Sequence, residues 1–92
     1  MKVLCVENYP AYLAKLRSVL HKAGYEVIEA SSAEEAVSLF VEHPVDGVLL
    51  EYDLPNKNGR AVRGEMKRIK PDVPILLFFG IGPRNVHISP LF

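Results

Sequence analysis

Short apolar runs alternate with stretches of helical periodicity along this chain. Four runs have the length and the β-branched or aromatic content of strands, at residues 3–6, 25–29, 45–50 and 74–79. The first run is continuously apolar, which is typical of a strand covered on both faces of a parallel sheet. The pattern predicts four short strands, and helical sequence fills the three intervals between them.

The first interval begins with helix-start signals. Asn8 and Pro10 predict a cap and a first-turn proline. Gly24 supplies the usual left-handed stop after the last apolar position. The apolar positions at helical spacing are Leu13, Leu16, Val19, Leu20 and Ala23. A helix of about four turns is predicted.

Two further helices are predicted by capping and turn residues. Ser32 followed by Glu35 forms a capping-box signature. The buried face of this second helix is expected to carry Ala33, Ala36, Val37, Phe40 and Val41. Turn residues fill positions 54–59, and the third helix is expected to bury Val62, Met66 and Ile69 before Pro71 and Pro74.

The resulting order is βαβαβαβ, which predicts an α/β fold with a parallel sheet and right-handed crossovers. In such sheets the working site lies at the carboxyl ends of the strands. The residues that follow or end the predicted strands at that edge are Glu7, Asn8, Glu51 and Phe79. We expect these side chains to gather in one place.

Composition narrows the class of protein. The chain of 92 residues is 49% hydrophobic and 24% charged, as in a single folded domain. The formal charge of zero argues against nucleic acid or an anionic membrane as a charge-steered partner. No apolar run reaches the length of a signal-peptide core or of a membrane span. We expect a cytoplasmic protein that binds neither membrane nor nucleic acid.

Other reactive or charged residues predict no chemistry. Cys5 is alone, so it cannot form an internal disulfide, and its strand position favours a core role. The three histidines lack metal-ligand spacing. The basic residues on and near the third predicted helix are interleaved with acids, which favours a solvated face.

Four positioned segments suggest a family. They are Lys2 to Pro10, Asp46 to Pro55, Gly59, and Pro74 to Gly80. Together they resemble the receiver domain of response regulators in two-component systems, in a chemotaxis-regulator-like form. The resemblance implies a flavodoxin-like, doubly wound parallel sheet. It also implies a receiver-like domain at 1–80 that stops after the fourth strand, without the family's last strand and last two helices, and an irregular tail at 81–92.

The resemblance assigns roles to individual residues. Glu51 stands at the phosphoacceptor position, where the family has aspartate four residues before a proline, here Pro55. Gly59 matches the family's glycine that closes the loop. Phe79 replaces the Thr or Ser whose hydroxyl serves as the switch in the family. A weak Mg²⁺ site is implied at Glu7, Asn8, Glu51 and Asp53, of which Asn8 lacks charge.

These departures predict poor phosphoryl transfer, which needs a nucleophile, a charge-neutralising metal and donors to the moving oxygens. Mg²⁺ stays a candidate cofactor with lowered affinity. We expect a degenerate receiver-like signalling module of a phosphorelay, without enzymatic activity, that acts through protein contacts with a histidine kinase or another signalling protein.

Alternatives stay open at this point. A residually active receiver would accept phosphate on Glu51 or Asp53. Glutamate at the acceptor position would alternatively mimic the phosphorylated state. The apolar fourth strand, at the edge of a shortened sheet, predicts self-association in a small assembly protein, or else a gene fragment that is scarcely stable alone.

Overall fold

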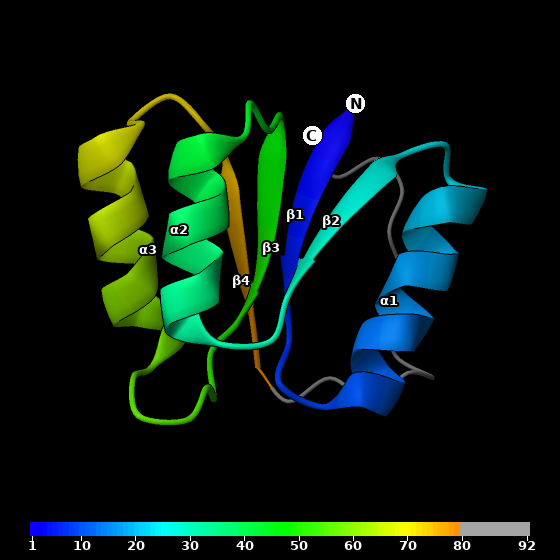
Figure 1. Ribbon diagram of the computed structural model, residues 1–92, viewed down its shortest axis with the longest axis horizontal. Helices are drawn as coiled ribbons and strands as arrows, with labels where there is room; N and C mark the ends of the chain where they lie inside the picture. Colours follow the sequence, from blue (N-terminus) through cyan, green and yellow to red (C-terminus); the bar gives the residue numbers. More distant parts are fainter. Residues whose placement is uncertain (80–92) are drawn as a thin grey trace.

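A single parallel sheet forms the centre of the protein (Figure 1). The computed structural model describes residues 1–79. Its four strands are β1 (Lys2–Val6), β2 (Glu26–Ala30), β3 (Gly47–Glu51) and β4 (Ile75–Phe78). They are arranged in the order β2-β1-β3-β4, the order expected of a flavodoxin-like sheet. The predicted α/β class and strand sequence are confirmed. The domain limit expected at residue 80 and the tail expected at 81–92 lie outside the described residues.

Helices cover both faces of this sheet, as a doubly wound fold requires. They are α1 (Pro10–Lys22), α2 (Ala33–Glu42) and α3 (Gly59–Ile69). In Figure 1, α2 and α3 lie side by side on one face, and α1 lies on the other. The connecting helices change from one face of the sheet to the other where the strand order reverses, between β1 and β3. The chain first runs outward from β1 to β2 and then returns past β1 to β3.

Successive side chains of each strand point to opposite faces of the sheet, so the core consists of two clusters, one on each face. Leu4, Val6, Val48 and Leu50 point toward α2 and α3, where Phe40 is among the buried residues packed against them. The larger cluster also contains Ala30, Ala33, Ala36, Val45, Leu54, Val62, Met66 and Ile75. The smaller cluster, on the α1 side, contains Val3, Cys5, Leu16, Leu20, Leu49 and Phe78. The most buried strands are β1 and β3, in which every residue of 3–6 and of 47–51 is buried, as expected for the central strands of a sheet covered on both faces.

The helix boundaries follow the predicted signals with two corrections. Asn8 does not cap α1, because the N-cap residue is Tyr9 and it forms no side-chain hydrogen bond to the helix. Ser32 does cap α2 by accepting a hydrogen bond from the Glu35 backbone N–H, but the Glu35 carboxylate accepts from the N–H of Ser31 rather than closing the box on Ser32. Gly24 has φ +90°, as a left-handed helix stop requires.

Two apolar residues predicted for the buried faces of α2 and α3 are exposed. Val41 in α2 and Ile69 in α3 both lie on the solvent side. Val41 lies one helical step of about 100° from the buried Phe40, which turns it off the stripe that meets the sheet. Ile69 lies on the same stripe as Val62 and Met66, but it is the last residue of α3. Phe40 and Met66, one and three positions earlier, supply the buried contacts instead.

Candidate functional site

Two acidic residues stand side by side at the carboxyl edge of the sheet. Val6 of β1 is paired in register with Leu50 of β3. The next residues along these parallel strands, Glu7 and Glu51, therefore lie at the same level of neighbouring strands. They are also the two buried charged side chains of residues 1–79, with exposed fractions of 2% and 4%. The predicted gathering of Glu7 and Glu51 at this edge is confirmed.

The Glu7 carboxyl group is held in the turn that leads into α1. Its Oε1 atom accepts a hydrogen bond from the Tyr9 backbone N–H at 3.1 Å, and its own backbone N–H donates to the Ala30 carbonyl oxygen at 3.1 Å. Burial raises the pKa of Glu7, while the backbone N–H groups of Tyr9 and Asn8 oppose that rise. Desolvation is the larger effect, so the neutral acid is favoured here relative to water.

The remaining residues expected to bind Mg²⁺ do not complete a donor set. Asn8 is half-buried and contributes no charge, and Asp53 is exposed. Within residues 1–79 no three His, Cys, Asp or Glu side chains come close enough to hold a metal ion. In proteins Mg²⁺ is usually bound through one or two carboxylates together with several waters. At this edge the carboxylates that would hold it are those of Glu7 and Glu51, with Asn8 as an uncharged donor beside them.

An aromatic pair occupies the neighbouring part of the edge. β4 ends at Phe78, which is paired in register with Glu51. The next residue, Phe79, is 60% exposed, and its ring lies 4.8 Å from the Tyr52 ring, centroid to centroid, with the planes inclined at 32°. Phe79 has no hydroxyl group to donate to a bound oxyanion. This position therefore offers apolar stacking where a polar contact is expected from the family resemblance.

The loop that joins β3 to α3 is tightly constrained. The Gly59 backbone N–H donates to the Tyr52 carbonyl oxygen at 2.6 Å, and the Asn58 side chain accepts from the Ala61 N–H at 3.0 Å. Asn56 adopts φ 67°, a left-handed conformation that asparagine tolerates better than most residues. Pro55 and Gly59, predicted from sequence as loop and turn residues, both lie in this segment.

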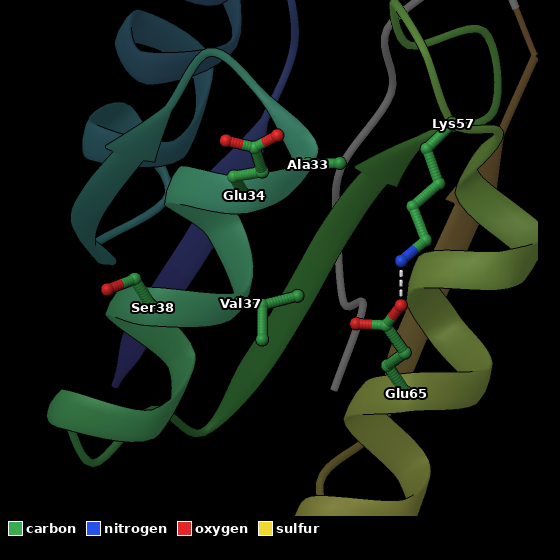
Figure 2. A pocket seen from close by; sticks show the side chains of 6 residues that line it. All are labelled: Ala33, Glu34, Val37, Ser38, Lys57 and Glu65. Atoms are coloured by element: carbon green, nitrogen blue, oxygen red, sulfur yellow. Dashed lines mark ion pairs between the residues drawn. The ribbon is translucent and has the colours of Figure 1, made fainter.

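Sequence reasoning missed a groove beside this loop. It runs between the first turns of α2 and α3, and its wall residues include Glu34, Lys57 and Glu65 (Figure 2). Glu34 is far from the other two in sequence, so no linear motif links them. In the sequence, the groove is indicated only by charged residues in the predicted helices and in the loop between the third strand and third helix.

None of the helices within residues 1–79 has the length and apolar character needed to cross a bilayer.

Comparison with known proteins identifies relatives over nearly the whole chain. A sequence profile described as "Response regulator receiver domain" matches residues 3–83. The chemotaxis protein CheY of Thermotoga maritima is 30% identical over 91 residues, covering 98% of this chain and 76% of that protein. A probable transcriptional regulator, ycf27, of Guillardia theta is 35% identical over 90 residues, covering 98% of this chain and 35% of that protein.

Solved structures agree with these sequence matches. The response regulator protein TrrA of Thermotoga maritima, crystallised in complex with Mg²⁺-BeF, superposes with a TM-score of 0.84. It is 30% identical, and the match covers 96% of this chain and 76% of that one. The chain spans about a third of the length of the transcriptional regulators among its curated relatives.

Proposed function

This chain belongs to the response-regulator receiver family, and from that premise we propose that it is a signalling module of a phosphorelay that works through protein contacts without efficient phosphoryl transfer. Receiver domains are signalling modules of two-component systems, so the proposal concerns how this member performs that role. A histidine kinase or another signalling protein is the proposed partner. The proposed location is the cytoplasm.

The observation that carries the proposal is the identity and burial of Glu51. A glutamate stands at the end of β3, where the family places its phosphoacceptor aspartate. Its carboxylate is roughly 1.5 Å further from the backbone than that of aspartate, because of one additional carbon–carbon bond. In-line attack on a phosphodonor tolerates misplacement of only ~0.5 Å. Attack from Glu51 is therefore expected to be very slow.

Two neighbouring features support the same conclusion. Phe79 replaces a hydroxyl side chain that would hold a phosphoryl oxygen, and its ring is stacked on Tyr52. The turn after β1 holds one carboxyl group, that of Glu7, which burial shifts toward its neutral form. Phosphoryl transfer requires neutralisation of the phosphate charge and donors to the moving oxygens. Neither requirement is met by these side chains.

The test is intact mass spectrometry of the folded protein after incubation with acetyl phosphate and Mg²⁺. The natural chain is expected to gain no phosphoryl group. A Glu51→Asp variant is the matched partner, because it supplies the shorter carboxylate and differs from the natural chain by one methylene group. An adduct on the natural chain at Glu51 or Asp53 would contradict the proposal and make the protein a working receiver.

The variant locates the cause of the loss. An adduct on Glu51→Asp alone would place the defect at Glu51. If neither protein gains an adduct, part of the defect lies at Asn8 and Phe79. A variant that combines Asn8→Asp, Glu51→Asp and Phe79→Thr is then the appropriate comparison. Both results agree with the proposed function.

A second candidate function is self-association through β4. This strand lies at the edge of the sheet in the described part of the chain, and Leu76 on it is 42% exposed on the side opposite α3. Exposed apolar edge strands favour pairing with another chain. Sedimentation velocity over a hundredfold range of concentration tests it: a dimer that Leu76→Lys dissolves supports this function, whereas a concentration-independent monomer removes it.

A further inference from the structure

Two adjoining hollows form one groove on the α2 and α3 side of the protein. Figure 2 shows the first hollow between the two helices: Val37 of α2 points toward α3, and Lys57 and Glu65 meet on the opposite side. Its lining consists of Ala33, Glu34, Val37, Ser38, Lys57 and Glu65. The second hollow shares Ala33, Glu34 and Lys57 and continues to Pro55 and Asn56 in the loop before α3. We call the two together the α2–α3 groove.

The walls of the α2–α3 groove are held in place by the backbone. Ser32 caps α2 at the start of one wall. The opposite wall follows the loop that is fixed by the hydrogen bond from Gly59 to Tyr52 and by the Asn58 cap. A ligand therefore meets a preformed surface, and binding requires little additional ordering of the chain.

The floor of the groove is apolar and its rim is acidic. Ala33 is buried and Val37 half-buried along one side of α2. Glu34 is exposed on the rim, and its carboxylate forms no hydrogen bond or ion pair with any other residue in 1–79. On the opposite wall Glu65 of α3 is paired with Lys57 (Figure 2). Two carboxylates and one ammonium group leave the rim with a net negative charge.

We propose that the α2–α3 groove binds a lysine or arginine side chain of a partner protein. The aliphatic stem of that side chain packs on Ala33 and Val37, as long basic side chains do on apolar surface, and its charged head lies between Glu34 and Glu65. Lys57 of the same chain already forms an ion pair with Glu65, so it competes with the incoming cation for that carboxylate. The inference rests on the proposed function, because it supplies a surface for the protein contacts.

An anionic ligand is disfavoured by the same geometry. Lys57 is the cation of the groove lining, and its ammonium group is engaged by Glu65. Glu34 stands in the first turn of α2 and repels an anion that approaches the helix N-terminus. An anion therefore meets one free carboxylate and no unpaired lining cation.

The experiment is an NMR titration of the full-length, ¹⁵N-labelled chain with an acetylated, amidated peptide, Gly-Arg-Leu-Arg-Gly. The matched control peptide carries citrulline, which has the shape of arginine without its charge, at both arginine positions. The arginine peptide is expected to shift amide resonances in Ala33 to Ser38 and around Lys57 and Glu65, and the citrulline peptide is not. Dispersed spectra of each variant establish that it is folded.

Three substitutions test the inference: two are expected to change the peptide affinity in opposite directions, and the third is a control. Glu34→Gln removes a free carboxylate and is expected to weaken peptide binding about threefold, the size of one exposed ion pair. Lys57→Met releases Glu65 and is expected to tighten binding by a similar factor, about threefold. Glu42→Gln, which removes an exposed acid at the far end of α2, is the control and is expected to leave the affinity unchanged.

Several results would overturn the inference. They are resonance shifts outside the groove, equal binding of the citrulline peptide, weaker binding to Lys57→Met, or saturable shifts at the groove with inorganic phosphate in place of the peptide. The acetyl phosphate experiment tests the chemistry at Glu51 separately. Failure of the peptide titration with no phosphoryl adduct would therefore remove this surface and leave the proposed function standing.

Discussion

Gly59 lies directly against the main chain of Glu51. A Cβ atom added to Gly59 would stand 2.5 Å from the Glu51 carbonyl oxygen and 2.8 Å from the Tyr52 Cα atom. Both obstacles are backbone atoms at the end of β3, so neither yields by a side-chain rotation. The first residue of α3 must be glycine for the helix to begin this close to the acidic position of the sheet.

Replacement of Gly59 by alanine is expected to destabilise the protein. Forcing a methyl group into this contact displaces the start of α3, and such overpacking costs about 1–3 kcal/mol of the free energy of unfolding. Urea denaturation followed by circular dichroism measures the change. Gly64→Ala in the same helix is the control: its nearest atom is the Arg68 Nη1 at 3.8 Å, so alanine is expected to stabilise by about 0.5–1 kcal/mol. Equal effects at the two glycines would contradict the close-approach explanation.

The buried carboxyl group of Glu7 predicts a dependence of stability on pH. Its pKa is raised in the folded protein above the ordinary value of about 4.5, chiefly by burial. A folded state that holds this proton more tightly than the unfolded state loses stability as pH rises from below the unfolded pKa through the folded one. This contribution therefore favours folding most below pH 4.5 and is lost as the pH rises through the folded-state pKa of Glu7.

Glu7→Gln keeps the acceptor oxygen for the Tyr9 N–H and removes the titration. The midpoint of thermal unfolding, measured at intervals from pH 4 to pH 7, is expected to fall less steeply with rising pH in this variant than in the natural protein. Glu26→Gln, at an exposed position on β2, is the control and is expected to keep the natural slope. An identical slope in Glu7→Gln and the natural protein would show that Glu7 is not the responsible group.

Cys5 is expected to resist thiol reagents while the protein is folded. It is completely buried on the α1 side of the sheet, and burial raises the pKa of its thiol from 9.0 to about 12. The fraction of reactive thiolate at pH 8 is then about a thousandfold lower than for an exposed cysteine, before lost access is counted. Reaction with Ellman's reagent should accelerate sharply when guanidinium unfolds the chain. Rapid reaction of the folded protein would contradict this placement of Cys5.

Lys70 connects the ends of α2 and α3. Its Nζ atom donates to the carbonyl oxygens of Phe40 at 2.6 Å and His43 at 3.0 Å, and it lies 4.9 Å from the centre of the Phe40 ring. It satisfies carbonyl groups at the negative end of α2. Lys70→Met keeps the aliphatic stem and is expected to cost about 1–3 kcal/mol of the free energy of unfolding, whereas Lys15→Met, on the exposed side of α1, is expected to cost less than about 0.5 kcal/mol. Similar costs for both variants would show that the helix connection is unimportant.

Much of the fold was predictable because its signals are local. Apolar runs identify β1 and β3. Gly24 marks a helix end through its backbone preference, and Ser32 marks a helix start through its hydrogen bond. Strand ends were predicted less well. The expected run at 74–79 is four residues long as a strand, Ile75–Phe78, because Phe79 leaves the sheet and stacks on Tyr52.

The site was predictable in position and only partly in detail. Glu7 and Glu51 were expected at one edge because carboxyl ends of parallel strands meet there, and the register places them beside each other. The burial of both side chains was not expected, since glutamates at strand ends are ordinarily solvated. The N-cap residue of α1 was also predicted wrongly, as Asn8 instead of Tyr9. Both residues precede Pro10, and only the backbone conformation of the folded chain shows which of them caps the helix.

By itself, the sequence determined the α/β class, the order of the elements and the edge of the sheet at which Glu51 stands. Hydrophobic periodicity and turn chemistry act over a few residues, and so they can be read without the fold. The tertiary structure decided which apolar residues are covered and which carbonyl groups the Lys70 ammonium group contacts. It also decided that Glu34, Lys57 and Glu65 line one groove. Those relationships depend on distances between elements remote in the chain, which only the packing of α2 and α3 on one face of the sheet establishes.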